Sequence, residues 1–309
     1  MDAWPNTRQE LADLFRQRYY AESQIPQGRQ ARLLLRLARL YERRGLRGSD
    51  GAVALCDLCP NAGQCWGGLP RSAVRRPTPQ RKTEDGGIVL PWVGPDYRPG
   101  GVVVIGINPN INPRDPTWLD LEHAISWEHY VKRTFERDRL SEDGSRFGGD
   151  STRAAGLVLD SIAGRPIRDR PARELVDVLR QTARLQTVKC VPKTQVSKPT
   201  PEMTQRCPAF LLRDELKILA PAAVITFGQI PREGVARLKG HETISTRSRR
   251  LSLGGLVAGQ LAIRVYHLDH PRYAPGFPAG FASLQRHLQR QRHHGSAQPR
   301  PGRRVRSSE

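Results

Sequence analysis

Four short apolar runs along the chain predict buried β-strands. They cover residues 102–105, 185–188, 222–227 and 261–268. The first and third are almost continuous aliphatic runs, which is the pattern of strands buried on both faces of a parallel sheet.

Helical patterns alternate with these runs. We expect helices at residues 31–44, 153–162, 172–183, 202–219, 234–239 and 281–289, where apolar positions recur at helical spacing. Strands that alternate with helices favour a mostly parallel sheet that is covered on both faces. The predicted fold is therefore α/β, a three-layer α/β/α sandwich with a central, mostly parallel sheet.

The pattern also divides the chain into regions. Residues 1–50 are predicted to form a basic helical extension, in which the second helix is stopped by Gly45. Residues 51–289 form the main domain, with a polar insertion at 110–145. Residues 290–309 are rich in Arg, Pro, Gly and Ser, which predicts a disordered basic tail.

Unusual polar residues follow three of the predicted strands. They fall at residues 106–112, 186–190 and 269–273. In open α/β sheets, ligands bind beyond the carboxyl ends of the strands. These three segments are therefore the predicted functional site.

The net charge of the chain indicates what kind of partner it binds. The 309 residues include 50 Lys and Arg but only 30 Asp and Glu, a net charge of +20. Such an excess favours a polyanion, and we expect DNA. No apolar run is long enough to span a membrane, and no signal peptide is evident. We expect a soluble, cytoplasmic monomer that associates with the bacterial nucleoid.

The five cysteines suggest metal binding. An odd number in a long chain with no secretion signal argues against a disulfide framework. Cys56 and Cys59 form a C-x-x-C pair, and Cys190 and Cys207 form a second, wider pair. Four thiolates can hold either zinc or a [4Fe–4S] cluster, and their spacing alone does not decide between them. Cys65 is the fifth cysteine, and we expect it to be a spare thiol.

The segment around the second pair carries a family resemblance. It begins at Lys189-Cys190, passes through Pro199-Thr200-Pro201-Glu202 to Cys207, and continues to the apolar run that ends at Gly228. This pattern resembles the iron–sulfur uracil-DNA glycosylases, families 4 and 5 of their superfamily, over roughly residues 50–290. The resemblance implies the fold of that superfamily. It also implies a [4Fe–4S] cluster on the four paired cysteines.

The segment after the first strand reads Gly106-Ile107-Asn108-Pro109-Asn110. It is similar to the first motif of the mismatch-specific and single-strand-selective branches, which supplies a catalytic Asn. The resemblance assigns this role to Asn108, beside a substrate contact at Gly106 and Ile107. Asn110 replaces the last glycine of the motif, and Asn tolerates left-handed backbone angles better than most residues.

The segment after the last strand begins His270-Pro271 and matches the second motif of the family. The resemblance makes His270 the residue that contacts the uracil O2. It makes Arg272 and Tyr273 the residues that enter the duplex.

Two further positions complete the predicted substrate site. Phe147 is the nearest match to the aromatic residue that stacks on the base. Gln186 stands where the family has an Asn that reads the pyrimidine edge, so the reading group is one methylene longer. Lys189 and Lys193 flank the cluster loop and are expected near phosphates.

These residues suit hydrolysis of an N-glycosidic bond. Asn108 can orient a water molecule, and a neutral His270 can donate a hydrogen bond to the departing base. Three alternatives remain open: a glycosylase for hypoxanthine, xanthine or an alkylated base, a catalytically weak DNA-binding homologue, and a zinc-bound structural or RNA-binding module. The altered residues Asn110 and Gln186 motivate the first two.

Overall fold

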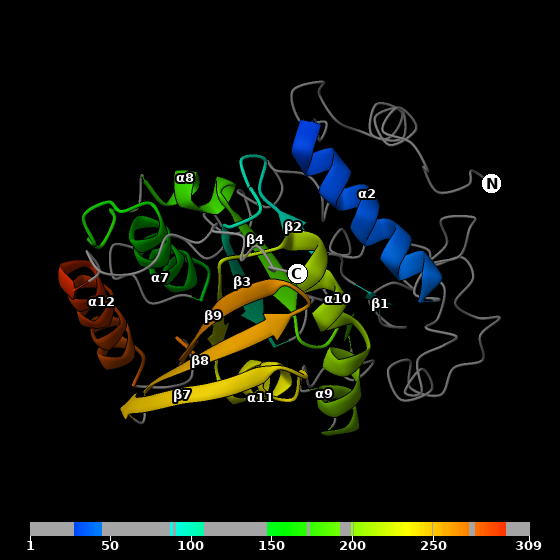
Figure 1. Cartoon of the computed structure of the whole chain (residues 1–309). Coiled ribbons are helices and arrows are strands. Elements are labelled where there is room, and N and C mark those ends of the chain that lie inside the picture. The colour runs from blue at the N-terminus through cyan, green and yellow to red at the C-terminus, as the bar shows by residue number, and fades with distance from the viewer. Residues whose placement is uncertain are drawn as a thin grey trace, which may run out of the picture.

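The computed structural model describes residues 28–44, 87–88, 91–107, 147–171, 174–191, 199, 201–248, 250–271 and 276–294. In these residues strands alternate with helices, and the chain is an α/β protein whose sheet is packed with helices (Figure 1).

Seven strands form one mixed sheet in the order β2-β4-β3-β6-β9-β8-β7. Their bounds are β2 (Trp92–Val93), β3 (Val102–Gly106), β4 (Thr182–Gln186), β6 (Ala223–Phe227), β7 (His241–Ser248), β8 (Leu251–Ala258) and β9 (Leu261–Leu268). Two short strands, β1 (Gly87–Ile88) and β5 (Cys190–Val191), pair with each other in an antiparallel sheet.

The four central strands are parallel. β3 pairs with β4 on one side and with β6 on the other, and β6 pairs with β9. The outer strands β2, β8 and β7 pair antiparallel to their neighbours. The predicted parallel sheet is therefore confirmed at the centre, and it is extended by antiparallel edges.

The helices lie at α2 (Gly28–Arg43), α7 (Phe147–Ile162), α8 (Leu175–Arg180), α9 (Pro201–Cys207), α10 (Arg213–Leu219), α11 (Gln229–Ala236) and α12 (Phe277–His294). The π-helical turn η6 (Pro208–Leu212) joins α9 to α10 without a break. In the described part of the chain, none of these helices combines the length and apolarity needed to cross a membrane.

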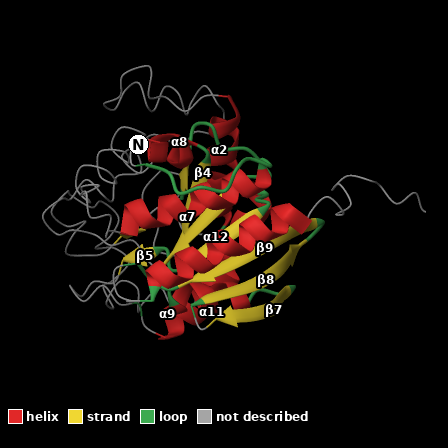
Figure 2. Ribbon diagram, turned by 90° about the vertical axis from the view of Figure 1, so that its left-hand side faces the viewer, coloured by secondary structure: helices red, strands yellow, loops and turns green. Residues whose placement is uncertain are grey.

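Helices cover both faces of the sheet. On one face, Val103, Ile105 and Val224 share a core with leucines of α2 and α10. On the other face, Val104 and Ile225 share a core with α7 and α12. Figure 2 shows α7 and α12 in front of the strands. Alternate residues of each central strand feed opposite cores, as expected for strands with a two-residue side-chain period.

The predicted helices correspond to observed ones, but several boundaries differ. α2 lies in the predicted N-terminal extension, and its leucines are part of the main core. The helix predicted at 172–183 is shorter, since α8 ends at Arg180 and the last two predicted residues, Thr182 and Ala183, begin β4. α12 continues to His294, past the predicted start of the disordered tail. The helix predicted near the N-terminus, the insertion at 110–145 and the end of the tail lie outside the described residues.

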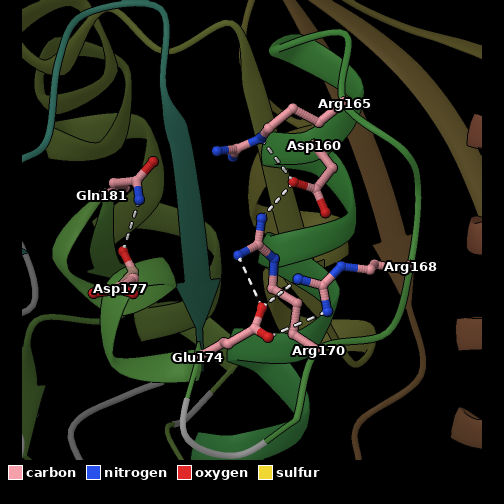
Figure 3. Close-up of polar contacts among 7 residues, drawn as sticks. All are labelled: Asp160, Arg165, Arg168, Arg170, Glu174, Asp177 and Gln181. Carbon is pink, nitrogen blue, oxygen red and sulfur yellow. Dashed lines mark hydrogen bonds and ion pairs between the residues drawn. The ribbon is translucent and has the colours of Figure 1, made fainter.

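An ion-pair network fixes the connection between α7 and α8 (Figure 3). The buried carboxylate of Asp160 accepts hydrogen bonds from Arg170 and, at 3.0 Å, pairs with Arg165. Glu174 pairs with Arg168 at 2.6 Å and with Arg170 at 3.6 Å. Asp160 is thus doubly compensated, which a buried carboxylate requires.

His267 is a buried histidine on β9, and it contacts residues of β6 and β7. The Nδ1 atom of His267 is 2.6 Å from the hydroxyl oxygen of Thr226. The ring of His241 lies 5.8 Å away, centroid to centroid. Burial, together with the nearby positive charges of His241 and Arg232, lowers the pKa of His267 to about 3. His267 is therefore neutral in the folded protein at neutral pH.

This histidine predicts a loss of stability in acid. The pKa of His267 is lower in the folded chain than its ordinary value of 6.5, so its contribution is complete above pH 6.5. That contribution falls as the pH drops towards 3, by up to about 1.4 kcal/mol per pH unit. Denaturant unfolding between pH 7 and 4 should show this slope.

His267→Gln should flatten the slope, since Gln can still bond to Thr226 without titrating. His241→Gln is the matched comparison. It should remove a smaller part of the pH dependence, because His241 is less buried than His267. Burial lowers the pKa of His241 as well. Identical slopes for the native chain and His267→Gln would show that His267 is not the source of the acid-dependent loss of stability.

Candidate active site

The carboxyl ends of the four parallel strands lie side by side. β3 and β4 end in register at Gly106 and Gln186, and β6 and β9 end in register at Phe227 and Leu268. β3 leads towards α7 on one face of the sheet, whereas β6 leads directly into α11 on the other. The connections therefore diverge between β3 and β6, which is where open α/β sheets form a ligand crevice.

Gly106 allows the side chain of Gln186 to lie against the end of β3. A β-carbon built on Gly106 would be only 2.7 Å from Gln186 Oε1. This oxygen is buried and has no hydrogen-bond partner among the described residues. Leaving such an acceptor unpaired costs about 1–3 kcal/mol, so a ligand N–H would be a favourable partner.

The end of β3 is held firmly by the loop after β4. The backbone N–H and the hydroxyl of Thr187 both donate to the Gly106 carbonyl, at 2.9 and 2.8 Å. The N–H of Val188 donates to the Ile107 carbonyl at 2.9 Å. Gly106 and Ile107, two predicted substrate contacts, are therefore fixed beside Gln186, and the chain leaves this pair towards Asn108.

His270 follows β9, at the other end of the same row of strand ends. The backbone of Gly228 has a φ of +88°, and a β-carbon there would be 3.3 Å from that of His270. The N–H of Gly228 donates to the Leu268 carbonyl at 2.8 Å. The glycine thus makes the turn from β6 into α11 and leaves room for the half-buried His270.

Lys189 lies at the end of β4, where we expected a phosphate contact. Its side chain is 1% exposed, and its ammonium lies 2.7 Å from Glu215 of α10. The same ammonium donates to the Gln186 carbonyl at 2.5 Å. In this structure the ammonium therefore faces Glu215 and the Gln186 carbonyl rather than the protein surface, where a phosphate contact is expected.

Lys189 also contacts one of the predicted metal ligands. Its backbone N–H donates to the Sγ atom of Cys207 at 3.4 Å, and Cys207 is buried. Cys190 is the next residue after Lys189, and its backbone pairs with Ile88. The fold therefore brings the backbone at Cys190 close to Cys207, although the two are far apart in sequence.

Hydrogen bonds from backbone N–H groups to sulfur are among the interactions that tune cysteine-bound clusters. Within the described residues, no group of three or more His, Cys, Asp or Glu could hold a metal ion. Cys56 and Cys59, the other two predicted ligands, lie outside those residues. Of the four predicted ligands, only Cys207 has a described side chain, and the metal site stays a prediction.

Several predicted site residues are not described. Asn108, Lys193, Arg272 and Tyr273 lie outside the described residues. Phe147 begins α7 and Cys190 begins β5, but only their backbones are described. Of the predicted substrate-site residues, the structure brings Gly106 and Ile107 together with Gln186 and places His270 in the same row of strand ends.

The sequence also carries a signal for the buried Lys189–Glu215 pair. Glu215 falls on the apolar face of its helix, four residues after Leu211 and four before Leu219, both of which are buried. A carboxylate at such a position requires a cation in the core. That requirement pointed to an internal lysine or arginine, and the structure supplies Lys189.

A scan against protein-family models and a search among curated proteins found no match to this chain. A functional assignment therefore depends on its own residues and their geometry.

The Lys189–Glu215 pair predicts a large and asymmetric effect on stability. Lys189→Met should lower the free energy of unfolding by about 3–5 kcal/mol, because it leaves a buried carboxylate without a counter-ion. The double variant Lys189→Met with Glu215→Leu should recover most of the loss. Denaturant unfolding of the full chain measures both.

Lys217→Met is the matched control. Lys217 pairs with Asp214 at 3.3 Å on the surface of the same helix, and exposed pairs contribute at most about 1 kcal/mol. Equal losses in Lys189→Met and Lys217→Met would show that the buried pair does not have the importance assigned to it.

Proposed function

We propose that the chain is a DNA glycosylase of the uracil-DNA glycosylase superfamily, which flips a deaminated or damaged base, in the first instance uracil, and hydrolyses its N-glycosidic bond. One observation carries the proposal. Gln186, His270 and the segment that leads into Asn108 all lie at the carboxyl ends of four adjacent parallel strands. Four neighbouring strand ends span about 14 Å. This length matches a base with its sugar.

The fold supports this assignment. Helices on both faces of the parallel centre fit the three-layer sandwich of that superfamily. The target base must leave the duplex to reach such a crevice, at a cost of a few kcal/mol. Phe147, at the start of α7, would stack on the flipped base and return about 1–3 kcal/mol.

Gln186 would read the edge of the base. Its unpaired Oε1 is an acceptor and calls for an N–H donor. Uracil offers one at its N3 position, and hypoxanthine and xanthine offer one at N1. The corresponding ring nitrogens of cytosine and adenine are acceptors. An acceptor at this position therefore favours uracil over cytosine and hypoxanthine over adenine, but it does not separate xanthine from guanine, whose N1 also carries a hydrogen.

His270 and Asn108 would carry the chemistry. Negative charge grows on the departing base as its bond to the sugar breaks, and a neutral His270 would donate a hydrogen bond to it. Asn108 would orient the attacking water through its side-chain carbonyl. It is too weak a base to abstract a proton early, which suits a path through a sugar cation.

The remaining residues would hold the DNA. Arg272 and Tyr273 directly follow His270-Pro271 and would fill the space that the flipped base leaves. Lys193, on the loop after Cys190, would contact phosphates. Lys189 acts indirectly, since its ammonium binds the Gln186 carbonyl and keeps the reading amide at the end of β4.

Cys56, Cys59, Cys190 and Cys207 would hold a [4Fe–4S] cluster. Such a cluster supplies a cross-link between segments that are distant in sequence. The support in this chain is the buried thiol of Cys207, which accepts a hydrogen bond from the residue before Cys190. Zinc on the same thiolates is the alternative.

Metal analysis tests the cluster. Protein purified without oxygen should be brown and contain about four irons per chain. Cys207→Ser should lose most of this iron, because one of four ligands is removed. Cys65→Ser is the matched control and should retain it. A colourless protein with one zinc per chain, made in cells that build clusters, would reject the iron assignment.

A base-release assay tests the function. The full chain is incubated in excess with duplex and single-stranded DNA that contains uracil, hypoxanthine, xanthine or an alkylated base. We expect release of uracil, and Asn108→Ala and His270→Ala should each slow single-turnover release by about 10²–10³-fold. DNA affinity should change little, because both contacts strengthen mainly in the transition state.

Arg98→Gln, at the opposite end of the sheet, is the control and should release base at the native rate. Gln186→Asn, measured on the same panel, should alter the ranking of the lesions without abolishing release. Full activity in both Asn108→Ala and His270→Ala, with the cluster intact, would place the active site elsewhere. Binding to damaged DNA with no release of any base would favour the catalytically weak homologue.

A further inference from the structure

Helix α2 carries a row of exposed arginines. The exposed residues of the helix, among those whose side chains are described, are Arg29, Arg32, Arg36, Arg39 and Arg43. They are separated by three or four residues, so they follow one face of the helix. We call this row the α2 arginine stripe.

The opposite face of α2 is fully used by the core. Ala31, Leu34 and Leu37 are at most 6% exposed and belong to the core on that side of the sheet. Gln30 reinforces this packing, because its side-chain amide donates to the Val93 carbonyl at 2.7 Å. α2 is therefore anchored, and the direction in which its arginines point is fixed by the fold.

The stripe differs from a group of arginines elsewhere in the described part of the chain. Arg153, Arg168, Arg170 and Arg180, for example, bond to carboxylates. Within the described residues, by contrast, no carboxylate pairs with Arg29, Arg32, Arg36 or Arg43. The only acidic residue in the sequence of α2 is Glu42, whose side chain is not described. Four positive charges on a rigid surface are thus left without an internal partner in the described structure.

The end of α2 lies against the segment that carries Cys207. Arg44 pairs with Asp214 of α10 at 2.7 Å, and its guanidinium lies 5.0 Å from the centre of the Phe210 ring. Phe210 belongs to the turn that directly follows Cys207. Figure 1 shows α2 beside α10, on the side of the sheet opposite α7 and α12. The stripe therefore begins close to the predicted cluster segment and runs away from it.

We propose that the α2 arginine stripe is a second DNA-binding surface, which holds the sugar–phosphate backbone of the duplex outside the catalytic crevice. The proposal rests on the proposed function for its choice of DNA as the partner. Fourteen residues separate Arg29 from Arg43, and helical rise makes this about 21 Å. Guanidinium groups bind phosphate in a bidentate manner, and phosphates recur along each strand of a duplex.

Charge complementarity favours DNA over a membrane surface. A basic amphipathic helix binds a bilayer by inserting its apolar face between the lipids. The apolar face of α2 is buried against the sheet and α10, so it is not available for insertion. Only the charges remain, and a rigid row of charges suits a polyanion of regular spacing.

The test uses undamaged duplex DNA, so that it does not depend on base release. Arg32→Gln with Arg36→Gln is compared with the native chain by fluorescence anisotropy at several salt concentrations. Each lost phosphate contact should reduce the slope of log affinity against log salt by about 0.9, which gives about 1.8 for the pair. Affinity near 0.1 M salt should fall at least tenfold. Single-turnover release at saturating enzyme should stay at the native rate.

The matched control removes two other exposed charges. Arg98 and Lys239 are exposed residues that precede β3 and β7, outside the stripe and at the end of the sheet opposite Gln186 and His270, and the control replaces both by Gln. It should leave the salt slope unchanged, and both double variants should unfold at the native midpoint. A native slope in the α2 variant, or an equal loss in the control, would overturn the proposal.

Two further results separate this proposal from others. Loss of binding to phosphatidylserine vesicles with DNA affinity unchanged would identify the stripe as a membrane contact and reject the proposal. Weakened binding of undamaged DNA in a chain whose native form releases no base would support the stripe while rejecting the glycosylase. Base release by the native chain, with a native salt slope in the α2 variant, would support the glycosylase and reject the stripe.

Discussion

The buried ammonium of Lys189 is the contact on which the carboxyl edge of the sheet depends. A charge that is 1% exposed must be compensated inside the protein. Lys189 achieves this only when the Glu215 carboxylate and the Gln186 carbonyl both face it. The end of β4, helix α10 and the Cys207 segment are therefore held in one arrangement. The Cys207 segment is thus connected to the end of β4 through one buried residue.

Close backbone approach gives the crevice its shape. Gly106 and Gly228 each lie where a β-carbon would press against a predicted site residue, Gln186 in one case and His270 in the other. At both strand ends the absence of a β-carbon therefore lets a polar side chain lie directly against the backbone. The same geometry explains why two unremarkable glycines at strand ends matter as much as the polar residues beside them.

The sequence predicted the parallel centre of the fold well and its edges poorly. The apolar runs that became β3, β6 and β9 lie on buried strands, where almost every position must be apolar, so their pattern is clear. β7 and β8 were not predicted, because His241–Ser248 is largely polar and Gly254-Gly255 interrupts the strand that pairs with it. The strand-end rule correctly grouped Gly106, Gln186 and His270. It could not foresee that Lys189 is buried, since that depends on a carboxylate on a distant helix.

The net charge of +20 gains meaning only when its distribution is known. Part of the arginine content serves the fold, as in the network around Asp160, where Arg165 and Arg170 compensate one buried carboxylate (Figure 3). Such pairs contribute little to the field that a distant polyanion experiences, because their charges cancel locally. The arginines of α2 have the opposite character: they project from a helix whose other face is fixed in the core. A high arginine content alone is therefore compatible with many functions. The arginines that bear on a partner are those on a fixed surface to which the described structure gives no carboxylate, and on α2 these are Arg29, Arg32, Arg36 and Arg43.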